Sequence, residues 1–155
     1  MGADLYWYYV PYEDDKDSAL QKLRQREFEA GRYRPVLYDD FFIDDPSKSP
    51  SPGRQHDTIE EILEETEEEG TGSILDLVKT TEKGYGYSVA YILNEKELRN
   101  FFGDEKPTRE KVHENLDKLW DDIAKKHGVR GVGVCIPIYK DGTPTELFFM
   151  GFSYD

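Results

Sequence analysis

Large side chains occupy both faces of the segment from Leu5 to Tyr12. Successive residues of a strand point to opposite faces, so one face carries Leu5, Trp7 and Tyr9, and the other carries Tyr6, Tyr8 and Val10. Strands that are covered by protein on both sides have this composition. The pattern predicts a strand buried on both faces, with Pro11 near an irregular end.

Residues 131–154 predict a β-hairpin. Apolar residues alternate from Val132 to Ile138, Asp141 and Gly142 supply a turn, and a second strand follows over 145–154. The second strand again has large side chains on both faces, which places it inside a sheet. Pro137 lacks an amide donor and therefore indicates an edge position or a bulge in the first strand of the hairpin.

Helical spacing predicts the segments between these strands. One helix begins at Asp17 or Ser18 and stops at Gly31, and a second begins at Thr58, where Glu61 completes a capping box, and stops at Gly70. A short helix over 95–102 and a long one over 108–127 follow, with strands over 73–78 and 85–93 between the second and third helices.

Together these elements predict an α+β fold of two layers. We expect a mainly antiparallel sheet that includes the N-terminal strand and the C-terminal hairpin, with three to four helices packed on it. The length of 155 residues fits a single domain over 1–155. Prolines and small residues predict a mobile loop over 44–57.

Negative charge is concentrated in one part of the chain. The stretch from 39 to 69 holds 12 acidic and two basic residues, and so carries ten of the 13 net negative charges. Such a balance argues against binding to nucleic acid or to an anionic membrane. It allows a basic protein partner, and it leaves the oligomeric state open.

The second helix carries most of these acids, and its like charges repel one another at four-residue spacing by about 0.2 to 0.5 kcal/mol a pair. Two interpretations stay open for its glutamates: a solvated outer surface, or a surface that binds a basic partner. The residues predicted to bind a partner are Glu60, Glu61, Glu64, Glu65 and Glu68.

Four arginines form the one basic concentration, next to an aromatic residue. They are Arg24, Arg26, Arg32 and Arg34, with Tyr33 between the last two. Arginine beside an aromatic ring can hold an anionic ligand. The acids Glu27, Glu29 and Asp17 are near enough in sequence to pair with the arginines internally, so the weaker alternative is an anion or ligand site.

No residue pattern indicates a catalytic, metal or cofactor site. The aspartates at 39, 40, 44 and 45 lack the spacing of a calcium loop, and His113 with Asp117 supplies only half a zinc site. The one cysteine, Cys135, alternates with apolar residues, which favours a buried, inert thiol. A single cysteine and the lack of a long apolar run predict a soluble, cytoplasmic protein.

Three segments, MGADLYWYYV, LRQREFEAGRY and TELFFMGFSYD, are similar to a group of small uncharacterised bacterial proteins. This resemblance brings no activity, cofactor or catalytic residue with it. In composition, a small acidic domain also resembles the immunity proteins that neutralise bacterial toxins.

These observations favour a non-catalytic protein-protein interaction domain, of the immunity or antitoxin type, that binds a basic partner. The alternative function is a small-molecule-binding domain or an enzyme with a pocket lined by arginines and aromatic residues.

Overall fold

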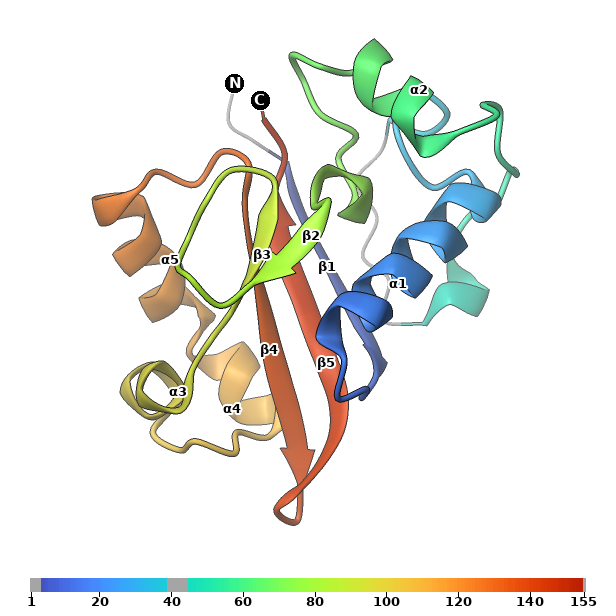
Figure 1. Cartoon of the computed structure of the whole chain (residues 1–155). Helices are drawn as coiled ribbons and strands as arrows, with labels where there is room; N and C mark the ends of the chain where they lie inside the picture. The colour runs from blue at the N-terminus through green and yellow to red at the C-terminus, as the bar shows by residue number, and fades with distance from the viewer. Residues whose placement is uncertain (1–3, 39–44, 155) are drawn as a thin grey trace.

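The computed structural model describes residues 4–38 and 45–154, and it contains one mixed five-stranded sheet (Figure 1). The strand order is β1-β5-β4-β3-β2, with β5 antiparallel to both β1 and β4, and with β3 parallel to both β4 and β2. The α+β class, with the N-terminal strand and the C-terminal hairpin in one sheet, is confirmed. The strands are β1 (Leu5–Pro11), β2 (Lys79–Thr81), β3 (Val89–Ile92), β4 (Val132–Lys140) and β5 (Thr143–Phe152).

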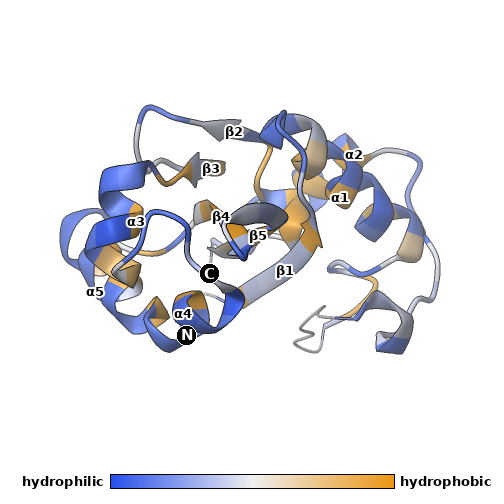
Figure 2. Cartoon of the chain, turned by 90° about the horizontal axis from the view of Figure 1, so that it is seen from below, coloured by the Kyte–Doolittle hydropathy of each residue, from blue (hydrophilic) through white to orange (hydrophobic). Residues whose placement is uncertain are grey.

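Helices cover both faces of the sheet. One face packs against α3, α4 and α5, and the other packs against α1 and the 3-10 turn η2 (Figures 1 and 2). The sheet is therefore the middle of three layers. The sequence predicted two layers, with the sheet as one of them. The helical elements are α1 (Lys16–Ala30), η1 (Pro46–Lys48), α2 (Ile59–Glu65), η2 (Ile74–Asp76), α3 (Glu95–Phe102), α4 (Arg109–Glu114) and α5 (Leu116–Lys126).

Alternation in β1 builds two separate hydrophobic cores. Tyr6, Tyr8 and Val10 pack under α1, whereas Tyr9 is buried on the side of α4 and α5 with Leu5 and Trp7 beside it. The helices turn their hydrophobic residues toward the sheet and their hydrophilic residues outward (Figure 2). The predicted burial of this strand on both faces is confirmed.

The predicted hairpin is present as β4 and β5. Asp141 has φ 53° and Gly142 has φ 78°, which is the left-handed geometry of a two-residue hairpin turn. Strand β5 lies inside the sheet, as expected. Pro137 lies beyond the last pairing of β4 with β3, so β4 is at the edge of the sheet at this position. The pairing of β4 with β5 shifts register one residue later, between Ile138 and Tyr139.

Side chains of α1 cover the outer edge of β2. The Asp17 carboxylate accepts hydrogen bonds from the Thr80 amide (2.9 Å) and hydroxyl (3.3 Å), and Gln21 donates to the Val78 carbonyl (3.0 Å). These bonds satisfy backbone groups that an edge strand otherwise offers to another chain.

Two predicted strands differ from the structure. The turn η2 takes the place of the strand predicted over 73–78, because the Ser73 hydroxyl accepts a hydrogen bond from the Leu75 amide and caps the turn. The strand predicted over 85–93 begins only at Val89, because Gly84 and Ser88 have positive φ values of 134° and 62° and break the extended backbone before it.

The long helix predicted over 108–127 is divided into α4 and α5 at Asn115. The Asn115 side chain donates to the Lys111 carbonyl at 2.8 Å, a local bond that competes with helix continuation. Val112, Leu119 and Ile123, which recur at helical spacing along the two helices, are fully buried. Among the described residues, no helix is long and apolar enough to cross a membrane.

Candidate functional site

The acidic helix α2 is held by its apolar side. Ile62 is fully buried in a third hydrophobic cluster. The cluster also contains Phe28 from α1, Tyr33 from the segment after α1, and Leu75 from η2. At the start of the helix, the Thr58 hydroxyl accepts from the Glu61 amide (3.2 Å). The Glu61 carboxylate in turn accepts from the Asp57 amide (3.2 Å), so the predicted cap is present, with its second bond one residue earlier than in a standard capping box.

The sequence predicted that the helix stops at Gly70, but helix α2 ends earlier, at Glu65. The Thr66 hydroxyl bonds back to the Ile62 carbonyl (2.8 Å), and residues 66–69 form a turn that the Gly70 amide closes on Thr66 (2.7 Å). Three glutamates at 67–69 would lie at the negative end of the helix dipole, which opposes continuation. The earlier end also leaves only two of the expected like-charge pairs inside the helix, Glu60 with Glu64 and Glu61 with Glu65.

All seven glutamates between 60 and 69 are exposed, and we call them the acidic surface. Glu65 bonds to His56 Nε2 at 2.6 Å, and Glu60 interacts electrostatically with Arg24. Within the described residues, Glu64, Glu67 and Glu68 make no hydrogen bond or ion pair. Of the five predicted partner-binding residues, three therefore have an internal interaction (Glu60, Glu61 and Glu65), and Glu64 and Glu68 have none.

A cleft of about 430 Å³ lies between the acidic surface and the segment that follows α1. One wall is formed by residues 64–69, and the other by Arg34, Pro35 and Tyr38, a residue that is 71% exposed. Arg34 bonds through Nη1 to the Asp4 carboxylate at 2.5 Å, so much of its charge is already neutralised. The cleft combines unpaired carboxylates with an exposed aromatic ring, which is the chemistry that holds an ammonium or guanidinium group.

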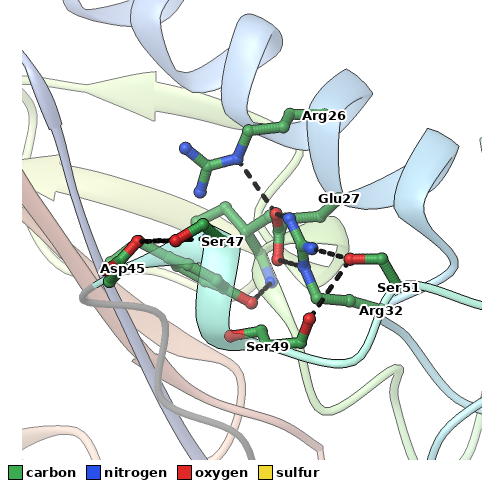
Figure 3. A network of polar contacts seen from close by, with 9 residues as sticks. Arg26, Glu27, Arg32, Asp45, Ser47, Ser49 and Ser51 are labelled. Atoms are coloured by element: carbon green, nitrogen blue, oxygen red, sulfur yellow. Dashed lines mark hydrogen bonds and ion pairs between the residues drawn. The ribbon is translucent and has the colours of Figure 1, made fainter.

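The predicted arginine group does not converge on one pocket. The Glu27 carboxylate, which is fully buried, accepts two bonds from Arg32 (Nε 2.9 Å, Nη2 2.5 Å) and one from Arg26 Nε at 3.0 Å. Figure 3 shows this carboxylate between the two guanidinium groups. The hydrogen bonds that Arg32 donates to Glu27 raise the pKa of Arg32. Arg24 is buried and donates to Gln21 and to the Leu75 carbonyl.

Arg32 and Tyr33 also bind the segment that was predicted as a mobile loop. Arg32 Nη1 donates to the Ser51 hydroxyl (2.6 Å), and the buried Tyr33 hydroxyl accepts from the Gln55 amide (3.1 Å) and contacts His56 Nδ1 (2.9 Å). The amides of Gly53 and Arg54 bond to the last carbonyls of α1. Residues 51–56 thus close the end of α1, and the mobility of 45–57 stays a prediction.

The aspartates considered for calcium are only partly visible, since positions 39, 40 and 44 lie outside the described residues. Asp45 accepts from the Ser47 amide (3.1 Å) and hydroxyl (2.6 Å). The His113 ring packs edge-on against Trp7 and Tyr9, at the end of α4. In the described part of the chain, no three acidic, histidine or cysteine side chains are arranged to hold a metal ion.

One polar residue of this region was not predicted from the sequence. Asp76 is fully buried in η2, where Oδ1 accepts from the Thr71 amide at 2.8 Å and Oδ2 has no donor in the described residues. Burial raises its pKa to about 6. The signal in the sequence was the spacing of Ser73 and Asp76, a serine followed by an acid three residues later, which is typical of a helical start.

Cys135 is buried between β3 and β5, and burial raises its thiol pKa to about 12, as expected for an inert cysteine.

Comparison of the chain with protein-family models, with curated proteins and with solved structures finds no match. The geometry of the described residues is therefore the basis for the function proposed next.

Proposed function

We propose that this chain is a non-catalytic interaction domain whose acidic surface binds a basic protein partner. The observation that carries the proposal is the group of exposed carboxylates at Glu64, Glu67 and Glu68, which have no partner among the described residues and line a cleft beside Tyr38. Immunity and antitoxin proteins work in this general way, by covering the working surface of a basic partner. We place the encounter in the cytoplasm, in agreement with the single buried cysteine.

Charge and shape support different parts of such binding. A concentrated negative surface raises the rate of encounter with a positive partner and fixes its orientation. The cleft then accepts one lysine or arginine side chain, with its charge near the carboxylates and its stem against the Tyr38 ring. Glu61 and Glu65 contribute less, because their carboxylates already hold Asp57 and His56.

The test compares two variants that lose the same number of carboxylates. The combined variant Glu64→Gln, Glu67→Gln and Glu68→Gln changes the acidic surface, whereas Glu114→Gln, Asp117→Asn and Asp121→Asn change exposed acids on α4 and α5, across the sheet. Each protein is used as bait in affinity purification from the source cells. We expect one stoichiometric basic partner with the wild type and the control, and none with the first variant.

The purified partner is then titrated calorimetrically at low and high salt. Affinity should fall at least tenfold for the acidic-surface variant, and the remaining affinity should depend less on salt. Equal affinity of the three proteins would refute the proposal. A partner without a basic surface would also refute it.

The alternative, binding of a small molecule, is supported by a different observation. One of the four predicted arginines, Arg26, has terminal nitrogens with no hydrogen bond to a described residue and lies beside an apolar groove.

A further inference from the structure

A groove runs between the end of β1 and the first three turns of α1, away from the acidic surface. Its volume is about 470 Å³, within the range of small-molecule sites. Its lining residues are Val10, Pro11, Glu13, Ala19, Lys22, Leu23 and Arg26.

The groove has an apolar floor and a cationic end. Val10, Ala19 and Leu23 form the floor and are exposed by 6% or less. On α1, Ala19, Leu23 and Arg26 follow one another at intervals of four and three residues, so they share one side of the helix. With a rise of 1.5 Å per residue, Arg26 lies about 10 Å along the axis from Ala19. An elongated ligand can therefore lie along α1 and end at Arg26.

Arg26 has hydrogen-bond donors to offer. Its Nε bonds to Glu27, but the buried Nη2 has no hydrogen-bond partner among the described residues, although an unpaired buried donor costs about 1 to 3 kcal/mol. In Figure 3 its terminal nitrogens point away from Glu27. The terminal nitrogens of the other predicted arginines are engaged: Arg24 with Gln21, Arg32 with Glu27 and Ser51, and Arg34 with Asp4 and Ser153.

The local charge favours an anion. Lys22 Nζ lies 2.8 Å from Glu13 Oε1, so these two groups neutralise each other at the side of the groove. The Glu27 carboxylate is shared by Arg26 and Arg32, which leaves one positive charge in excess. This excess is opposite in sign to the net charge of −13 that the whole chain carries.

We propose that this groove binds a small carboxylate with an unbranched apolar tail. The carboxylate accepts from the terminal nitrogens of Arg26, and the tail covers Val10, Ala19 and Leu23. Both parts are needed, because the charge fixes the orientation and the burial of the tail supplies most of the affinity. The site is independent of the acidic surface, so either proposal can fail without the other.

Titration with octanoate, followed by amide chemical shifts of the full chain, tests the proposal. We expect saturable shifts confined to residues 10–13 and 19–27. Octylammonium, which has the same tail and the opposite charge, should bind at least tenfold more weakly. Shifts that do not saturate, that spread over the surface, or that are equal for the two probes would overturn the proposal.

Two variants identify the residues involved. Arg26→Gln should weaken octanoate binding at least tenfold, because the carboxylate loses its donors. Since this change also removes a bond to Glu27, Lys22→Glu provides a second measurement: it adds repulsion at an exposed position and should weaken binding about tenfold. The matched control is Arg54→Glu, which makes the same charge change at Glu29, outside the groove. Unchanged affinity for Lys22→Glu, or an equal loss for Arg54→Glu, would contradict the assignment.

Discussion

At the scale of single residues, Asp76 is a buried polar group whose hydrogen bonding is incomplete. Its Oδ2 has no donor in the described residues, and the nearby Tyr6 hydroxyl is also buried without a partner. Burial is the main cause that raises the pKa of Asp76 to about 6, and the Thr71 bonds and Arg34 oppose it only in part. The folded protein therefore favours the neutral carboxyl of Asp76 more than the unfolded chain does.

This preference has a defined effect on stability. The unfolded chain loses the Asp76 proton near pH 3.8 and the folded chain near pH 6, so the folded state binds more protons between these values. The stabilising contribution is complete below pH 3.8 and is lost as pH rises through 6, at a cost of roughly 3 kcal/mol by pH 7. Asp76→Asn cannot ionise and should be more stable than the wild type at pH 7.

Urea denaturation between pH 4 and pH 8 measures this difference. The free energies of unfolding should be similar for the two proteins near pH 4, should diverge between pH 4 and pH 6, and should differ by a constant amount above pH 7. A variant that is less stable than the wild type at pH 7 would mean that the charged carboxylate has partners of its own in the folded state.

At the scale of elements, the Glu27 and Arg32 pair joins α1 to the segment after it. Arg32→Ala should cost about 3 kcal/mol, because Glu27 keeps only its bond to Arg26 and stays fully buried. The amides of Gly53 and Arg54 should exchange with solvent faster, since Ser51 loses its bond to Arg32.

Thermal unfolding and hydrogen exchange measure these two effects. Arg54→Ala is the control, because its ion pair with Glu29 is long (3.7 Å) and exposed and should be worth less than 1 kcal/mol. If the alanine variant of Arg32 does not fold, Arg32→Lys keeps the charge and should show a smaller loss. Equal stability of all the variants would show that Glu27 does not depend on Arg32.

Local patterns predicted the elements better than their boundaries. Alternation in β1, the hairpin turn and the caps at Thr58 and Gly31 were correct because short-range chemistry determines them. The division at Asn115 was missed because a single side-chain bond to Lys111 decides it. The parallel pairing of β3 was not predictable, because strand order depends on contacts between residues distant in sequence.

The candidate sites were predictable to a similar extent. The acidic residues could be named because charge is visible in the sequence, and the expectation of internal pairing holds for Arg26 and Arg32 with Glu27. Glu29 pairs with Arg54 instead, and Asp17 bonds to Thr80 and interacts with Arg24 only electrostatically. The free end of Arg26 was not predictable, since it depends on which donors the folded chain leaves unused.

At the scale of the whole molecule, the acidic surface should make stability depend on salt. Two like-charge pairs remain inside α2, and each costs about 0.2 to 0.5 kcal/mol at low salt. Screening by 0.5 M NaCl should therefore raise the melting temperature by roughly 1 to 4 °C. Calorimetry of the acidic-surface variant should show a smaller rise, and the variant of α4 and α5 should match the wild type. A rise that is equal in all three would place the repulsion elsewhere.

The ion pair of Asp4 with Arg34 has a practical consequence for handling the protein. Asp4 and Ser153, near the first and last described residues, both bond to Arg34, which lines the acidic cleft. A purification tag or a fused fluorescent protein at either end would crowd that cleft and mask a real partner. The Asp141–Gly142 turn lies at the opposite end of the sheet, so a short affinity epitope inserted there would leave the acidic surface open.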